Sequence, residues 1–131
     1  MPRTSRERHA IFWLDAFTAS NPGDRLMITL CIRYKFNPEK LADITQYFEN
    51  EQRVIERSGG RIVGYFLPTD FAGANDEAIG LIDLPSLAAY EEYRQRLADD
   101  PEHKENIARL QHSGAEVAMN RSFIRRVPVH R

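Results

Sequence analysis

Apolar and polar residues alternate with a period of two where the regular part of the chain begins. The even-numbered positions of residues 28–36 carry apolar side chains: Ile28, Leu30, Ile32, Tyr34 and Phe36. The odd-numbered positions between them carry Thr29, Cys31, Arg33 and Lys35. This alternation predicts a β-strand with its even-numbered side chains facing the core.

A helical pattern follows this strand. Asn37 and Pro38 are typical of a helix start, because asparagine caps free N–H groups and proline lacks a donor that would stay unpaired there. Apolar residues then recur at helical spacing: Leu41, Ile44, Phe48 and Ile55. Gly59 and Gly60 are expected to end the helix, since glycine adopts the left-handed cap conformation without a Cβ clash.

The second half of the chain repeats this order. Residues 61–67 and 77–84 predict two strands joined by a loop, and residues 115–126 predict a fourth. A second helix begins near Ser86 and carries Leu87, Tyr90, Arg94 and Leu97 on one stripe. Asp100 and Pro101 are expected to begin a further short helix. The order strand, helix, strand, strand, helix, strand predicts an α+β fold.

The chain of 131 residues has the length of one domain, which we expect over residues 27–126. Residues 1–26 form an N-terminal extension of different character, and Met27 is a candidate for the authentic start. If the extension is present, residues 11–17 are expected to form a short helix on the domain. Asp15 interrupts an apolar run too short for a signal peptide, so we expect a cytoplasmic protein. Residues 127–131 are expected to be a C-terminal tail.

Composition excludes several classes of function. The 18 basic and 19 acidic residues give a net charge of −1, which provides no field to attract nucleic acid. No apolar run approaches the about 20 residues that a membrane-spanning helix requires. Cys31 is the single cysteine, so no internal disulfide can form, and its place in a strand favours a small buried apolar side chain.

The second face of the sheet is expected to need a cover. Two helices cover one face of a four-stranded sheet. In the second strand Val63, Tyr65 and Leu67 lie on one parity and Ile62 and Phe66 on the other, so both faces carry apolar side chains. A second copy of the chain, packed sheet on sheet as a homodimer, is the simplest cover. The alternative is that residues 10–17 fold back over this face.

The sequence contains no recognisable catalytic motif. It has no glycine-rich phosphate loop, no His-Glu-x-x-His, no Cys-x-x-Cys and no Gly-x-Ser-x-Gly. Asp99 and Asp100 are better explained by helix ending and capping than by acid–base chemistry. We therefore expect no cofactor and no metal, and the sequence identifies no catalytic residue.

An aromatic set marks a candidate binding site. Tyr34, Phe48, Phe66 and Tyr90 are expected to border one space between sheet and helices, as packed core or as an apolar cavity for a small hydrophobic ligand. Asp83, near the end of the third strand, either makes a salt bridge or cap at the rim or is a buried acid with a raised pKa.

Several motifs resemble those of NIPSNAP domains. Tyr34 followed by residues 37–41 (NPEKL) resembles the family's Y-x-x-x-P-G-K-L, and residues 59–66 (GGRIVGYF) resemble its G-G-x-x-x-G-Y-W/F. Residues 83–87 are similar to its Y-x-S-L entry to the second helix, and Asp100-Pro101 to its D-P. The resemblance covers residues 27–126 and implies a ferredoxin-like βαββαβ fold with a four-stranded antiparallel sheet, the dimeric α/β barrel.

This resemblance also bears on function. The superfamily includes small cofactor-independent oxygenases, isomerases and haem-degrading enzymes, whereas NIPSNAP domains have no settled activity. The family often has Glu and Arg at the positions of Leu30 and Ile32, and His and Trp at those of Gly80 and Ile82. The resemblance therefore implies a cleft without its usual acid–base groups.

We thus expect a NIPSNAP-like homodimeric binding or structural module with a largely apolar cleft. The alternative is a cofactor-independent monooxygenase or isomerase for a small hydrophobic or aromatic substrate. In that case Tyr34 and Tyr65 orient the substrate and Asp83 or His103 carries the proton. Haem binding would require His103 to point inward. The predicted binding residues are Tyr34, Phe48, Tyr65, Phe66, Asp83, Tyr90 and His103.

Overall fold

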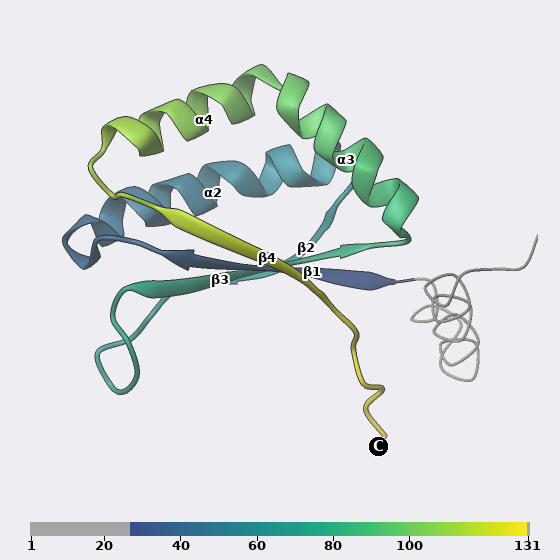
Figure 1. Cartoon of the computed structure of the whole chain (residues 1–131), viewed down its shortest axis with the longest axis horizontal. Coiled ribbons are helices and arrows are strands. Elements are labelled where there is room, and N and C mark those ends of the chain that lie inside the picture. The colour runs from purple at the N-terminus through teal and green to yellow at the C-terminus, as the bar shows by residue number, and fades with distance from the viewer. Residues whose placement is uncertain (1–26, 131) are drawn as a thin grey trace, which may run out of the picture.

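Three α-helices lie on one face of a twisted four-stranded sheet in the computed structural model, which describes residues 27–130 (Figure 1). The expectations for residues 1–26, including the short helix at 11–17, lie outside the described residues, as does Arg131. The elements follow the order β1, η1, α2, β2, β3, α3, α4 and β4. The described residues include no helix that is long and apolar enough to cross a membrane.

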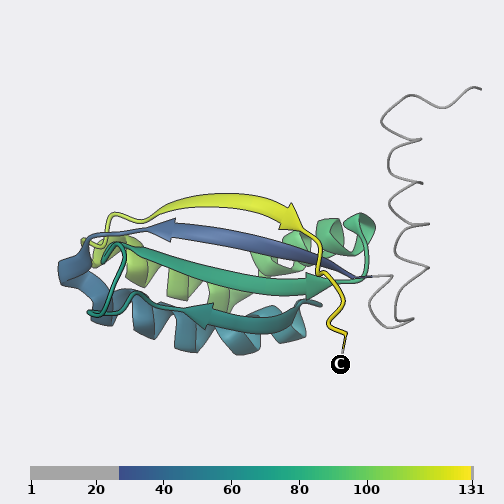
Figure 2. The same cartoon turned by 90° about the horizontal axis from the view of Figure 1, so that it is seen from below.

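The sheet consists of β1 (Ile28–Lys35), β2 (Arg61–Phe66), β3 (Glu77–Leu84) and β4 (Ala118–Ile124). The strand order is β2-β3-β1-β4, and every neighbouring pair is antiparallel (Figure 2). The predicted ferredoxin-like βαββαβ arrangement is confirmed. The last strand begins later than predicted, because Gly114 and Glu116 adopt positive φ angles in the turn before it, and it also ends two residues earlier.

Side-chain capping fixes where the helices begin. A short 3-10 helix, η1 (Pro38–Lys40), leads into α2 (Leu41–Arg57), and the Asn37 side chain accepts a hydrogen bond from the Glu39 amide. In α3 (Leu87–Asp99) the Ser86 side chain caps the Ala89 amide. In α4 (Pro101–His112) Asp100 caps the amides of both Glu102 and His103. These are the start signals that the sequence indicated.

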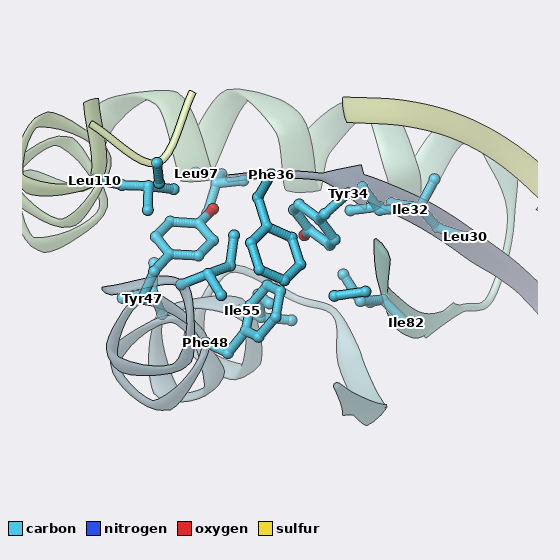
Figure 3. Packing of buried hydrophobic residues seen from close by; sticks show 14 of the residues in the cluster. Leu30, Ile32, Tyr34, Phe36, Tyr47, Phe48, Ile55, Ile82, Leu97 and Leu110 are labelled. Atoms are coloured by element: carbon cyan, nitrogen blue, oxygen red, sulfur yellow. The ribbon is translucent and has the colours of Figure 1, made fainter. Parts of the chain in front are cut away.

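The core lies between the helices and the even-numbered side of β1. Leu30, Ile32 and Tyr34 are buried there with apolar residues from α2 (Figure 3). Leu87, predicted to join the buried stripe of α3, is instead 59% exposed. It lies in the first turn, ahead of the turn in which Tyr90 meets Phe123, and Tyr93 and Leu97 are the buried residues of α3.

A bulge in β2 interrupts the alternation of that strand. Ile62 pairs with Ile82 of β3 and Gly64 with Leu81, so Val63 is the extra residue. Beyond the bulge Tyr65 turns toward the helices together with Ile62, whereas Phe66 turns to the open face. The prediction that Phe66 borders the space under the helices is therefore wrong, and Tyr65 takes its place.

Interhelical ion pairs fasten the start of α4 to the end of α2. The Arg57 guanidinium donates to both carboxylate oxygens of Asp100, at 2.7 and 2.8 Å, and also to Glu102. The hydrogen bonds from Arg57 and from the amides of residues 102 and 103 hold the pKa of Asp100 well below its usual range. Asp100 thus combines capping with an ion pair.

Replacing Asp100 with alanine is expected to lower the free energy of unfolding by about 1–2 kcal/mol at pH 7. Since its pKa is depressed in the folded state, the charged form stabilises the fold above the unfolded pKa of about 3.9. That contribution is lost as pH falls through the folded pKa. Urea unfolding from pH 7 down to pH 3 should show the wild-type advantage shrinking. Asp100→Asn, which keeps a capping oxygen, should cost less than alanine at pH 7, and a pH-independent gap would contradict this account.

Candidate functional site

A cavity of about 180 Å³ lies between the sheet and the three helices. Every strand and every α-helix contributes to its wall. The strands supply Leu30, Ile32, Tyr34, Tyr65, Ile82, Met119 and Arg121, and the helices supply Tyr47, Glu51, Ile55, Tyr93, Arg94, Leu97, Ala98, His103 and Ile107. Half of these lining residues are apolar and half carry a phenol, a carboxylate, an imidazole or a guanidinium group, so the wall offers both packing surface and polar groups to a small molecule.

Aromatic rings form the side of the cavity nearest β2. The rings of Phe48 and Tyr65 stack with centroids 4.1 Å apart, and Tyr34 meets Phe48 edge-on at 4.9 Å. Figure 3 shows Tyr34 and Phe48 in the layer of buried side chains between β1 and α2. Gly80 gives Tyr65 its room, because a Cβ there would come within 2.7 Å of the Tyr65 ring. The missing side chain at residue 80 therefore positions the ring.

A buried carboxylate organises the opposite side of the cavity. Glu51 is 2% exposed, and its Oε2 accepts a hydrogen bond from the Tyr47 hydroxyl at 3.0 Å and lies 2.6 Å from Nδ1 of His103. Its Oε1 accepts from the Asn106 amide at 3.3 Å. A carboxylate at Nδ1 favours the tautomer with its proton on that nitrogen, which leaves Nε2 of His103 as a proton acceptor.

The tyrosine hydroxyls serve as neutral donors. Burial raises the pKa of Tyr34, Tyr47, Tyr65 and Tyr93 above the ordinary value of 10. A hydrogen bond with Tyr65 and the positive charge of Arg121 offset only part of this effect at Tyr34. These phenols therefore stay protonated near neutral pH. They can orient an oxygen of a ligand, but they cannot act as bases.

The structure brings together four of the predicted site residues. Tyr34, Tyr65 and His103 line the cavity, and Phe48 packs against two of the rings. Tyr90 is half-buried and contacts Tyr93 and Phe123 instead of the cavity. The expectation that Phe66 and Tyr90 share the space with Tyr34 is therefore wrong.

Asp83 lies on the other face of the sheet. It pairs in register with Thr29, whose hydroxyl donates to it at 2.6 Å, and Arg126 forms a salt bridge with it at 3.1 Å. Its neighbour Ile82 is the β3 residue that faces the cavity. The predicted salt bridge of Asp83 is confirmed, but the side chain is buried at 5% exposure and not at a rim. Its place on the other face of the sheet puts it outside this cavity.

Five polar residues of the site were missed from the sequence: Tyr47, Glu51, Tyr93, Arg94 and Arg121. Tyr47, Glu51 and Ile55 are spaced four residues apart, so they lie on one face of α2. An acidic residue inside an apolar helical stripe is the signal that was available. The strand positions Leu30, Ile32, Gly80 and Ile82 supply no acid–base group, as expected, but α2 and α4 contribute Glu51 and His103 to the cavity wall.

No group of three or more His, Cys, Asp or Glu side chains suited to a metal ion occurs within residues 27–130. Cys31 is 6% exposed, as expected for a small apolar side chain in a strand. The chemistry available in the cavity is hydrogen bonding by phenols, proton acceptance by His103, and the positive charge of two arginines.

Comparison with known proteins identifies the fold and the family. The NIPSNAP family model matches residues 29–130. An uncharacterized NIPSNAP-like domain protein from Burkholderia xenovorans has 24% identity and a TM-score of 0.63, covering 79% of this chain and 86% of that one. A NIPSNAP family protein of unknown function from Agrobacterium tumefaciens has 19% identity and a TM-score of 0.63, with 78% and 91% covered.

A more distant structure also shares the fold. SnoaB, a cofactor-independent oxygenase from Streptomyces nogalater, has 13% identity and a TM-score of 0.54, covering 79% of this chain and 95% of that one. The comparison with curated proteins finds no match. At these identities the solved structures support the fold alone.

Proposed function

Because the chain belongs to the NIPSNAP family, we propose that it is a homodimeric binding module whose tyrosine-lined cavity holds a small, largely apolar molecule. The observation that carries this proposal is the cavity of about 180 Å³ with a hydrogen-bonded Glu51–His103 pair in its wall. An engineered cavity of about 150 Å³ accepts benzene, so this volume suits one small ring with one or two substituents. It does not suit a haem macrocycle.

The homodimer is proposed to form through the open face of the sheet. Phe66 is 52%, Val63 43% and Ile124 45% exposed on or beside this face. Within residues 27–130 the helices all lie on the other side (Figure 2). A second copy of the chain would bury these side chains, as sheet-on-sheet packing does. Residues 27–126 form the proposed domain, and a single buried cysteine is consistent with a cytoplasmic location.

A second candidate function, a cofactor-independent isomerase or oxygenase, is favoured by the placement of His103. In an isomerisation, Nε2 would take a proton from a carbon next to a carbonyl and return it to another carbon, so no co-reactant is needed. Tyr34 and Tyr65 would donate hydrogen bonds to the oxygen that gains negative charge. Oxygenation would consume dioxygen in addition.

Small aromatic probes test the cavity directly. We expect benzamide or benzoate to shift the backbone NMR signals around Glu51, Tyr93 and His103 in the ¹⁵N-labelled full chain. Ala98→Phe should abolish these shifts, because Ala98 lines the cavity and the larger side chain fills it. Ala88→Phe, an exposed position of the same helix away from the cavity, should preserve them. Probes that bind with equal affinity to the Ala98→Phe variant would contradict the proposed site.

A further inference from the structure

Two exposed arginines line the cavity. Arg94 comes from α3 and Arg121 from β4, and both side chains line the cavity while remaining exposed. The Arg121 guanidinium donates a hydrogen bond to the sulphur of Met119 at 3.6 Å. Among residues 27–130, neither guanidinium forms an ion pair with a carboxylate, in contrast to Arg53, Arg57 and Arg126. Within the described part of the chain, two guanidinium groups that pair with no carboxylate thus border the cavity.

From this arrangement we infer that the cavity selects a small planar monocarboxylate, with its ring among the tyrosines and its carboxylate on Arg94 and Arg121. The inference rests on the proposed binding function and adds the chemical class of the ligand. Guanidinium groups bind carboxylates through paired, charge-assisted hydrogen bonds, which are stronger than neutral ones. An anion therefore gains a contact that a neutral ring of the same shape lacks.

The fields of both arginines reach the interior of the cavity. Burial raises the pKa of Tyr93, and the charge of Glu51 adds to this effect, whereas Arg94 and Arg121 act in the opposite direction. Arg121 also acts on Tyr34. Both positive charges thus act on phenols that line the wall, and they would also act on a charged ligand placed among those phenols.

The inner end of the cavity is expected to select the part of the ligand that lies away from the arginines. Glu51 accepts hydrogen bonds there and offers no donor, so a second carboxylate on the ligand would meet a like charge. The walls beside it are formed by Leu30, Ile32, Ile55 and Ile82, which favour an apolar ring. A ligand with one carboxylate at the mouth and an apolar or phenolic body fits both ends.

Benzoate and benzamide provide a matched test, because they share size and shape and differ in charge. We expect benzoate to bind the full-length chain about tenfold more tightly at low salt, as one well-placed charged hydrogen bond would give. The preference should shrink as salt is added, since the arginines are exposed. In the Arg94→Gln/Arg121→Gln double variant, the two affinities should agree within about twofold.

Arg96→Gln is the matched control. Arg96 is on the same helix, is exposed, lies 4.0 Å from Glu92 and does not line the cavity, so benzoate binding should be unchanged. Equal affinity of benzoate and benzamide for the wild-type chain would overturn the inference while leaving the binding module intact. A benzoate preference that survives the double variant would also overturn it. Binding of neither probe would refute the proposed function itself.

Discussion

Replacing Glu51 with alanine is expected to give the largest loss of stability of any single polar substitution in the described domain. The change removes the acceptor of Tyr47, His103 and Asn106 together. Buried donors without an acceptor and an imidazole without its partner are expected to lower the free energy of unfolding by about 3 kcal/mol or more. Urea unfolding at pH 7 measures this loss. The variant should also fail to bind the aromatic probes, because His103 loses the contact that orients it.

Glu49→Ala is the control for this experiment. Glu49 is in the same helix and exposed, so its replacement should change the free energy of unfolding by less than about 0.5 kcal/mol. A Glu51→Ala variant as stable as Glu49→Ala would show that the hydrogen-bond network does not stabilise the fold. Glu51→Leu separates the two roles, since an apolar side chain of similar volume restores packing without restoring the acceptor.

Introducing lysine at Phe66 is expected to convert the proposed dimer into single chains. The exposed Phe66 ring lies over Gly64 on the open face of the sheet, and a Cβ added at Gly64 would be 3.1 Å from this ring. Removing a central aromatic residue from an interface costs about 2–4 kcal/mol, which corresponds to a roughly 30- to 1,000-fold weaker dimer. Sedimentation equilibrium at micromolar concentration should show a two-chain mass for the wild type and a one-chain mass for Phe66→Lys.

Leu87→Lys controls for the addition of charge to an exposed apolar position. Leu87 lies on the helical side of the molecule, so this variant should remain a dimer. A chain beginning at Met27 tests the alternative cover of the open face. If residues 10–17 cover it, the full chain should be a monomer and the shortened chain should associate. A monomeric wild type and a monomeric shortened chain would refute dimerisation through the sheet.

The fold was predictable because its elements carry strong local signals. Interactions between residues close in sequence determine where these elements begin and end. The signals are the alternation in residues 28–36, the caps at Asn37, Ser86 and Asp100, and the glycines after α2. A β-bulge is different, since it depends on how β2 pairs with β3. That single extra residue exchanged the faces of Tyr65 and Phe66.

The site was only partly predictable for a related reason. Tyr34 was predicted as part of an aromatic set and His103 as a candidate proton carrier, but their partners come from elements distant in sequence. His103 and Glu51 are separated by 52 positions. Arg121 reaches the cavity because β4 pairs with β1 in a register that places it opposite Ile32. The pattern of residues within one strand does not predict which strand it pairs with or in which register. In contrast, the position of Glu51 inside the apolar stripe of α2 does indicate a buried acid.

The close fit of Gly80 against Tyr65 has an evolutionary consequence. The phenol ring and any side chain at residue 80 compete for the same volume, because a Cβ there would meet the ring at 2.7 Å. Relatives that bear a side chain at the equivalent of residue 80 and a tyrosine at the equivalent of Tyr65 must hold that ring in a different position. The residue at position 80 would therefore decide where the tyrosine ring lies, and it would divide the family's members into subgroups with differently shaped cavities.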